Sequence, residues 1–246
     1  MFIDGALYRL IGSIRDLRSR ALFKTIELYC HGDVLDIGGW NFYARKVINN
    51  PKIKFKNWIN LEPDDHHLTA VSDKRYKLVI GDGCATEFSD MSFDTVLNIQ
   101  VLEHVFEPIK MVKEIGRVLK PGGYGIFLIP QTSVLHHAPE HYYNFTRYWI
   151  SKAMGMSGLE IVSLKTIGGF WTSLASHLVY FFVQSAKVPG YSTADHKRNT
   201  AFYLLFPFMC LYALISIPIC LVFGWGDLSE EPNNHWVVVR KVKANG

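Results

Sequence analysis

The sequence has few cysteines, no internal repeat and no long run of one charge. The four cysteines are Cys30, Cys84, Cys210 and Cys220. They show no paired metal spacing, so we expect reduced thiols in a cytosolic redox environment. The net charge of +4 is too small to indicate nucleic acid, although it is compatible with an anionic membrane surface. We therefore predict no nucleic-acid partner. The length of 246 residues suits one α/β domain with an added element.

The N-terminal segment lacks the uninterrupted apolar core of a secretory signal, because charges such as Arg9 and Arg15 break it. Between Leu7 and Leu22, apolar residues recur at helical spacing. We therefore expect an amphipathic helix within residues 1–29. Two placements are open for it: packed on the sheet or over a ligand site, or lying on a membrane surface.

The stretch His31–Asn41 contains the first motif that points to a ligand. Residues 34–37 form a short apolar run around Asp36, of the length of a buried strand, and Gly38–Gly39 follow. Glycine after a strand lets the backbone turn tightly and approach a ligand. The pattern is typical of nucleotide-binding α/β proteins, although an ordinary glycine turn would look the same.

More strands and motifs follow in order. Residues 57–61 predict a strand that ends in Glu62, at about the distance where a carboxylate binds a ribose. Further strands are expected at 78–80, 93–98, 124–129 and 159–166, with helices over 109–119 and from Thr146 to Gly155. The accompanying motifs are Gly81-Asp82-Gly83, Leu102-Glu103-His104-Val105 and Leu119-Lys120-Pro121-Gly122-Gly123.

Together with Asp36-Ile37-Gly38-Gly39, these motifs resemble those of class I S-adenosylmethionine-dependent methyltransferases, over about residues 30–167. The similarity is to the type 11 group and to members from polysaccharide and lipid-linked glycan clusters. It implies a Rossmann-like α/β fold with a seven-stranded mixed sheet, and S-adenosyl-L-methionine as the cofactor. The cofactor-binding residues that it implies are Asp36, Gly38, Gly39, Glu62, Asp82, Gly83 and Asn98.

The resemblance also assigns roles. Glu62 would accept hydrogen bonds from the ribose hydroxyls, Asp82 would face the adenine amine, and Asn98 would lie near the methionine part. The carboxylate roles suit the chemistry, since hydroxyls and amines donate hydrogen bonds. The chain departs from the family at Trp40 or Asn41, where a further glycine is usual.

Two histidines are candidate catalytic residues. His104 follows the fourth-strand motif at the rim where an acceptor would lie, and its ordinary pKa suits a general base. A structural role in the turn is the other interpretation. His141 lies in a stretch, His136 to Arg147, that resembles the border of the acceptor pocket in glycan-cluster methyltransferases.

We predict no metal site. The similar quinone-pathway O-methyltransferases carry Glu-x-x-Glu-His, which supports a metal, but this chain has Gln100 in place of the first acid. Pro139 prevents a continuous helix, so His136, His137 and His141 would not share one helical face.

Residues 168–226 are the second informative region. Tyr203 to Phe223 carries no charge and at helical rise matches the thickness of a bilayer core. A single span is disfavoured, because residues 235–240 resemble the last strand, which would insert antiparallel beside the fifth and sixth. Pro207 and Pro218 are expected to break the run. We predict two apolar helices in one leaflet, a monotopic insertion, with residues 227–246 returning to the sheet. A buried hairpin or dimer interface is the soluble alternative.

The prediction is therefore a methyltransferase at the cytoplasmic face of a membrane. Its acceptor would be an amphiphilic or lipid-linked molecule, with O-methylation of a glycan sugar hydroxyl first and a quinone precursor or another lipophilic phenol second. Two further classes stay open. A nicotinamide dehydrogenase would need the full Gly-x-Gly-x-x-Gly, which is missing here. A non-catalytic membrane adaptor would keep the fold without turnover. The oligomeric state is not predicted.

Overall fold

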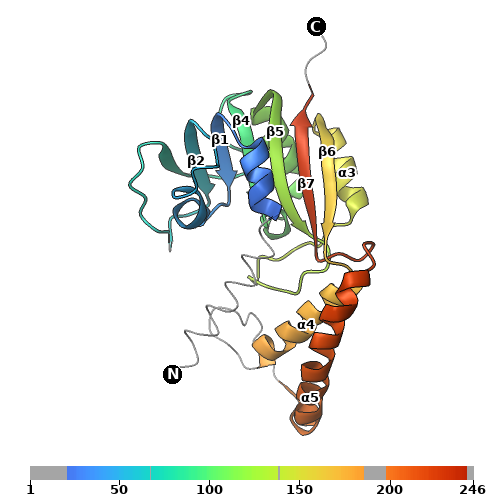
Figure 1. Ribbon diagram of the computed structural model, residues 1–246. Coiled ribbons are helices and arrows are strands. Elements are labelled where there is room, and N and C mark those ends of the chain that lie inside the picture. Colours follow the sequence, from blue (N-terminus) through green and yellow to red (C-terminus); the bar gives the residue numbers. More distant parts are fainter. Residues whose placement is uncertain (1–20, 67, 138, 186–197, 243–246) are drawn as a thin grey trace.

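The computed structural model describes residues 21–66, 68–137, 139–185 and 198–242. Its centre is one sheet of seven strands in the order β3-β2-β1-β4-β5-β7-β6 (Figure 1). The strands are β1 (Asp33–Ile37), β2 (Asn57–Glu62), β3 (Tyr76–Ile80), β4 (Phe93–Ile99), β5 (Leu119–Pro130), β6 (Leu159–Ile167) and β7 (Asn234–Lys241). All neighbours pair in parallel except β7, which is antiparallel to β5 and β6. The predicted Rossmann-like mixed sheet, with its antiparallel last strand, is confirmed.

Helical layers cover both faces of the sheet. One face packs against α2 (Pro108–Val118) and α3 (Arg147–Met156). The other packs against helical residues 21–29 and the short helical turn η1 (Tyr43–Val47). Burial on both faces explains why the central strands are nearly continuous apolar runs in the sequence. Residues 1–20 of the predicted N-terminal helix lie outside the described residues.

The glycine-containing turn before the fifth strand differs from the prediction. Lys120–Gly123 lies within β5 instead of preceding it. The ladder with β4 pairs Phe93 with Leu119 and then Thr95 with Tyr124, so the intervening residues bulge out. A positive φ of 83° at Gly122 allows this bulge.

Two helices project as a pair from one end of the sheet (Figure 1). α4 (Phe170–Ser185) follows β6, and α5 (Thr200–Phe223) leads through the turn η3 (Gly224–Gly226) to β7. We call residues 168–226 the helical hairpin. At a rise of about 1.5 Å per residue, α4 is about 24 Å long and α5 about 36 Å long.

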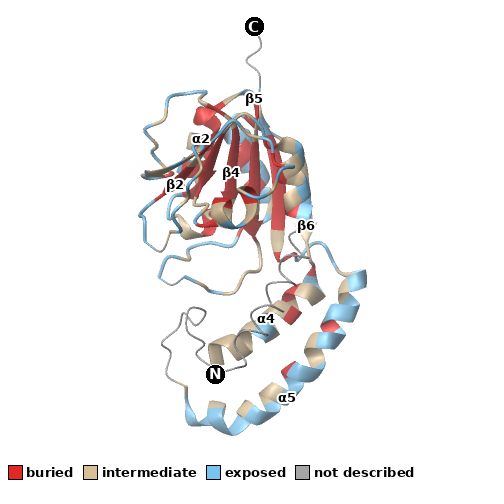
Figure 2. Ribbon diagram, turned by 60° about the vertical axis from the view of Figure 1, so that its left-hand side comes forward, coloured by how far each residue is buried: buried red, intermediate tan, exposed pale blue. Residues whose placement is uncertain are grey.

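The prediction that Pro207 and Pro218 break the apolar run is wrong. α5 continues through both prolines as one helix, and Figure 2 shows it as a curved but uninterrupted ribbon. A proline inside a helix removes one hydrogen bond and bends the axis, which a long helix can accommodate.

The apolar side chains of α5 are mostly exposed (Figure 2). Ala213 and Cys220 are its buried residues. The exposed ones include Tyr203, Leu204, Leu205, Phe208, Leu211, Tyr212, Leu214, Ile215, Ile219, Leu221, Val222 and Phe223. Among the described residues, Thr200–Gly226 is the one helical segment whose length and composition would suffice to cross a membrane. The described part of the protein therefore leaves a long apolar surface uncovered.

Asp227 fastens the base of the helical hairpin. Its carboxylate accepts the backbone N–H groups of Trp171 at 2.7 Å and Thr172 at 3.0 Å, together with the Thr172 hydroxyl. Burial raises the pKa of Asp227, but the hydrogen bonds from Thr172, Trp171 and Leu228 outweigh burial and lower it. A residue after α5 thus caps the start of α4, so both ends of the hairpin are held at one point.

Candidate functional site: the carboxyl edge of the sheet

Parallel pairing brings the predicted ligand residues to one edge of the sheet. β1 lies between β2 and β4, and Ile37 is in register with Leu61 on one side and Asn98 on the other. Asp36 therefore lies beside the ends of β2 and β4, and Glu62 is the last residue of β2. Ligands of open α/β sheets bind in the crevice at this carboxyl edge.

Asp36 is the most deeply placed polar group at this edge. It is 1% exposed, and neither of its carboxylate oxygens has a hydrogen-bond partner among the described residues. Burial, and then the negative charge of Glu62, raises the pKa of Asp36 to about 8. A Cβ on Gly39 would overlap Oδ2 of Asp36, and one on Gly38, which has a φ of 67°, would come 2.7 Å from Val101. Gly39 therefore lets the turn pass directly over the carboxylate, and Gly38 lets it pass close to Val101 with a positive φ.

Trp40 occupies the position where the family resemblance suggests glycine. Its φ of 46° lies in the left-handed region, so the backbone keeps a conformation that glycine favours. The Trp40 N–H donates to Oε1 of Glu62, and Nδ2 of Asn60 donates to the Trp40 carbonyl at 3.1 Å. The indole is half exposed, with the Arg45 guanidinium 5.0 Å from its ring centroid. The backbone at Trp40 thus has the conformation that glycine favours, and the indole is half exposed to solvent.

The other predicted cofactor residues are Asp82, Gly83 and Asn98, and they differ in their hydrogen bonds and contacts. Oδ1 of Asp82 accepts the N–H of Cys84 at 2.8 Å, so part of this carboxylate shapes its own turn. A Cβ on Gly83 would meet Met111 at 2.7 Å. Asn98 is fully buried, with Nδ2 3.3 Å from the Met111 sulfur and Oδ1 without a partner. Asn98 and Asp36 thus both hold buried acceptor atoms without partners.

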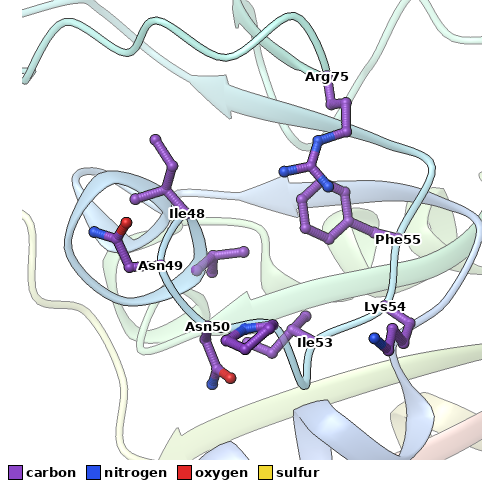
Figure 3. Close-up of a pocket in the computed structure, with 9 residues that line it drawn as sticks. Ile48, Asn49, Asn50, Ile53, Lys54, Phe55 and Arg75 are labelled. Carbon is purple, nitrogen blue, oxygen red and sulfur yellow. The ribbon is translucent and has the colours of Figure 1, made fainter.

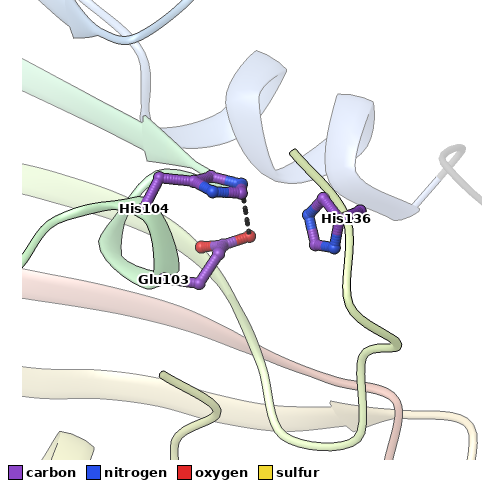
Figure 4. A group of neighbouring side chains, drawn as sticks. All are labelled: Glu103, His104 and His136. Atoms are coloured by element: carbon purple, nitrogen blue, oxygen red, sulfur yellow. Dashed lines mark ion pairs between the residues drawn. The ribbon is translucent and has the colours of Figure 1, made fainter. Parts of the chain in front are cut away.

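A second group of polar side chains lies after β4. Glu103 and His104 belong to the turn η2 (Leu102–His104), and His136 lies in the loop after β5 (Figure 4). One donor atom from each lies within 4.8 Å of the other two, and Nε2 of His104 is 3.9 Å from Oε1 of Glu103. The His104 ring centroid is also 5.4 Å from that of His137 and 5.6 Å from that of His141.

Burial shifts the pKa values of Glu103 and His104 in opposite directions. Glu103 is fully buried, neither of its carboxylate oxygens has a hydrogen-bond partner, and burial raises its pKa to about 7. Burial, and then the neighbouring histidines, lowers the pKa of His104 to about 4. His104 is therefore neutral at physiological pH.

Hydrogen bonds with backbone groups determine which ring nitrogen of His104, His136 and His141 carries the proton. Nδ1 of His104 lies 2.5 Å from the carbonyl oxygen of Glu140, and Nδ1 of His136 lies 2.9 Å from that of Val134. A carbonyl oxygen only accepts, so each Nδ1 carries the proton and each Nε2 presents a lone pair. Nδ1 of His141 instead accepts the N–H of His136 at 3.2 Å, which places its proton on Nε2.

The sequence singled out His104 and His141 but not Glu103 or His136. Glu103 stood within the quoted motif, and its burial could not be read from the pattern. Pro139 does keep its segment out of a helix, as predicted, yet the loop itself folds so that the histidine rings meet. The prediction of no metal site rested on Gln100 in place of an acid and on the lack of a shared helical face, and it did not consider a folded loop.

Comparison with known proteins shows which family shares these residues. Residues 38–127 match a family described as a methyltransferase domain. That match contains the glycine turn, Glu62, Asp82, Asn98 and the η2 turn. Residues 38–127 thus carry a methyltransferase domain, and the sheet that contains them is of the class I S-adenosylmethionine-dependent type. S-Adenosylmethionine is the cofactor of this class.

Curated relatives agree over part of the methyltransferase domain. A protein of Mycolicibacterium smegmatis assigned as an S-adenosylmethionine-dependent methyltransferase is 29% identical over 125 residues, which is 50% of this chain and 47% of that protein. An uncharacterised methyltransferase of Mycolicibacterium gilvum is 30% identical over 97 residues, 38% of this chain and 37% of that protein. The chain thus spans less than half the length of these relatives.

Solved structures share the fold of the methyltransferase domain. An S-adenosylmethionine-dependent methyltransferase from Archaeoglobus fulgidus superposes with a TM-score of 0.56 at 12% identity, covering 93% of this chain and 94% of that one. A Haloferax volcanii methyltransferase, solved with the Trm112 activator, gives 0.59 at 14% identity, covering 94% and 93%. At these identities the likeness concerns the fold alone.

The residues at the edge fit the cofactor of this class. The unpartnered oxygens of Asp36 and the unpartnered Oδ1 of Asn98 are buried acceptors that a ligand with donor groups would satisfy. Gly39 lets the backbone lie directly against the Asp36 carboxylate, where a Cβ would overlap Oδ2, and Gly38 provides the positive φ of the turn. Glu62 stands at the end of the next strand, where a ribose would be held. In the methyltransferase domain these four groups, with Asn98, would hold S-adenosylmethionine.

Two hollows lie at the opposite edge and are separate from this site. The smaller, of about 410 Å³, lies around the residues that precede β2 and β3, including Asn49, Lys54 and Phe55 (Figure 3). The Arg75 guanidinium lies 4.4 Å from the Phe55 ring centroid, which makes this wall a packed structural contact. The larger hollow, of about 570 Å³, is lined by the first residues of β1, β2 and β3. Both open at the amino ends of the strands.

Proposed function

We propose that this chain methylates a hydroxyl oxygen of an amphiphilic or lipid-linked acceptor, such as a glycan sugar, at the cytoplasmic face of a membrane. The methyl donor in this proposal is S-adenosylmethionine, bound at the carboxyl edge of the sheet. The helical hairpin supplies the membrane contact. Its long uncovered apolar surface is the kind of patch that marks a lipid or protein interaction site.

One observation supports linking the membrane contact to the acceptor. The hairpin packs directly on the loop that carries the histidines: the Tyr180 hydroxyl of α4 donates to the carbonyl of Leu135 at 2.6 Å, immediately before His136. Nearer the base, the Thr132 hydroxyl donates to Oγ of Ser173 at 2.9 Å. An acceptor lying in the surface of a bilayer around the hairpin would therefore have its polar head near His104 and His136.

The chemistry asks little of the protein beyond alignment and proton removal. When bound, S-adenosylmethionine would supply an activated methyl group for the acceptor oxygen, with the electron pair of the broken carbon–sulfur bond left on sulfur and the hydroxyl proton taken by a base. Asp36 and Glu62 would hold the cofactor. Nε2 of His104 has a free lone pair for the proton, whereas Nδ1 of His141 accepts a backbone N–H. The geometry favours His104 of the two candidates.

Cofactor binding is the first test. We would titrate the detergent-solubilised protein with S-adenosylhomocysteine and, in parallel, with NAD. The proposal expects binding of S-adenosylhomocysteine alone, weakened at least about ten-fold in Glu62→Ala, because a bidentate contact to a ribose diol is lost. Binding of NAD instead would favour a dehydrogenase, and binding of neither would favour an adaptor.

Methyl transfer is the second test. Protein in vesicles made from the lipid extract of the source organism would receive S-adenosylmethionine with a radioactive methyl group. The proposal expects label in a lipid-extractable product that resists mild alkali, as an ether does, and loss of that label in Glu62→Ala. Label in a small phenol instead would support the quinone-precursor alternative, and absence of label with intact cofactor binding would contradict the proposed activity.

A further inference from the structure

We propose that Glu103, His104 and His136 form a binding site for a divalent metal ion of the zinc class. The three side chains come from two separate elements, the turn η2 and the loop after β5, and they converge in the structure (Figure 4). Two imidazoles and one carboxylate are a ligand set that zinc takes in catalytic sites, where a fourth position stays open.

The two histidines are already oriented as metal ligands. Each donates its Nδ1–H to a backbone carbonyl, of Glu140 for His104 and of Val134 for His136. This outer contact fixes the ring and leaves the Nε2 lone pair directed elsewhere, which is the usual arrangement of histidines that bind metals. His141 is protonated at Nε2 and bonds through Nδ1 to the His136 backbone, so it supports the loop and is not a ligand.

Glu103 gives the independent reason to expect a cation. Its side chain is fully buried, and both carboxylate oxygens lack a hydrogen-bond partner in the part of the chain that the structure describes. A buried carboxylate without partners is costly, and buried charges in proteins are normally paired or bound to metals. No Lys or Arg side chain pairs with Glu103 within the described residues; its ion-pair neighbour is His104, at 3.9 Å. A divalent ion would satisfy the carboxylate and both imidazoles together.

The distances require only a small adjustment. Ligands at about 2.1 Å from a tetrahedral ion lie about 3.4 Å apart. The donor atoms of the cluster lie up to 4.8 Å apart, and the His104–Glu103 pair is at 3.9 Å. Side-chain rotations that bring the donor atoms closer by up to about 1.4 Å would complete the site. The loop that carries His136 is held in place by the Tyr180 hydroxyl, which donates to the carbonyl of Leu135.

The role of the ion, unlike its binding, rests on the proposed function. The open fourth position would hold the acceptor oxygen and favour loss of its proton, since an oxygen bound to zinc is more acidic. His104 would then serve as a metal ligand and not as a free base. The ion would stand beside the methyl donor without changing how Asp36 and Glu62 hold it.

Metal binding is tested without turnover. The full-length protein, treated with a chelator and returned to metal-free buffer, would be titrated calorimetrically with zinc chloride. We expect one zinc per chain, and at least about ten-fold weaker binding in Glu103→Gln and in His136→Ala, because even loss of an outer contact costs that much. His137→Ala is the matched control: this histidine neighbours the same rings but is exposed and outside the ligand set. Its zinc affinity should stay unchanged.

A second readout identifies the ligands. Cobalt(II) added in place of zinc should give the visible absorption of a tetrahedral ion in the wild type and in His137→Ala, and not in Glu103→Gln. Titration with S-adenosylhomocysteine checks that every variant is folded, and it separates this inference from the proposed function. Cofactor binding without zinc binding, or zinc binding that survives both ligand substitutions, would overturn the metal site. Zinc binding without methyl transfer would leave the site in place and remove the proposed role.

Discussion

Substituting Ile215 by aspartate should release the protein from membranes. Ile215 lies near the middle of α5 and is 54% exposed, although it is strongly apolar. On the insertion scale, an aspartate at a helix centre costs about 3 kcal/mol and the lost isoleucine adds about 0.5 kcal/mol. A total of about 3.5 kcal/mol corresponds to a roughly 300-fold lower membrane partition coefficient, since each 1.4 kcal/mol is a factor of ten.

The assay is flotation with vesicles of phosphatidylcholine and phosphatidylglycerol. Met91 provides a matched control, because it is also 54% exposed but lies before β4, at the amino ends of the strands and opposite the hairpin. Met91→Asp adds the same charge and should float as the wild type does. Circular dichroism would check that Ile215→Asp keeps its fold, since a half-exposed position tolerates a polar side chain.

Two results would refute this reasoning. If the wild type does not float, the exposed surface of α5 is covered by something other than lipid. If Ile215→Asp floats as well as Met91→Asp but loses a dimer seen by light scattering, the surface is an interface between two copies. Residues 1–20 would then be the next candidate for any membrane contact, which a truncation beginning at Ala21 would measure.

Three further predictions concern the methyltransferase domain. Asp36, whose pKa is raised to about 8, keeps its proton in the native state while the unfolded chain loses it near pH 4, so Asp36 alone contributes a fall of up to about 1.4 kcal/mol per pH unit to the free energy of unfolding between pH 5 and 7. Denaturant titrations should show the slope changed by this amount in Asp36→Asn; an identical slope in both proteins would contradict the buried, unpaired carboxylate. Gly38→Ala should cost about 1–3 kcal/mol in the same assay, from its left-handed backbone and the overlap with Val101, whereas an unchanged midpoint would mean that the turn is wrongly placed. Asp227→Ala should cost about 1–2 kcal/mol by uncapping α4, and proteolysis should then cut the hairpin first; equal cleavage rates would argue against the fastening role.

Much of the sheet could be predicted because its signals are local. Short apolar runs bounded by glycine and polar residues placed all seven strands, and Thr146 does begin α3, where its hydroxyl accepts the N–H of Trp149. The parallel pairing, and hence the shared edge of Asp36 and Glu62, came from the family resemblance that these motifs carry. The strands and helix starts themselves depend on residues close together in the chain.

The parts that escaped prediction depend on distant contacts. Glu103 and His136 meet only because the loop after β5 folds back over η2, and no spacing in the sequence encodes that approach. Pro207 and Pro218 were expected to interrupt α5, but its neighbours and its length carry the helix through both. Trp40 stands out in the sequence only as a departure from the glycine that is usual in the family. In the structure it adopts the left-handed backbone itself, at a cost of about 1–2 kcal/mol by comparison with glycine.

The position of the helical hairpin follows from the topology of the sheet. β6 runs parallel to the first five strands, so it ends at the carboxyl edge, and β7 runs antiparallel, so it begins at the same edge. An insertion between them must leave and return there, beside the cofactor residues. β6 and β7 are paired from Ile167 with Asn234 to Leu159 with Lys241. An odd number of membrane crossings between β6 and β7 would put the two strands on opposite sides of the membrane, where they could not pair. If α5 enters a membrane, the chain therefore has to return to the side on which it entered. The fold thus directs any lipid contact of α5 to the edge where methyl transfer would take place.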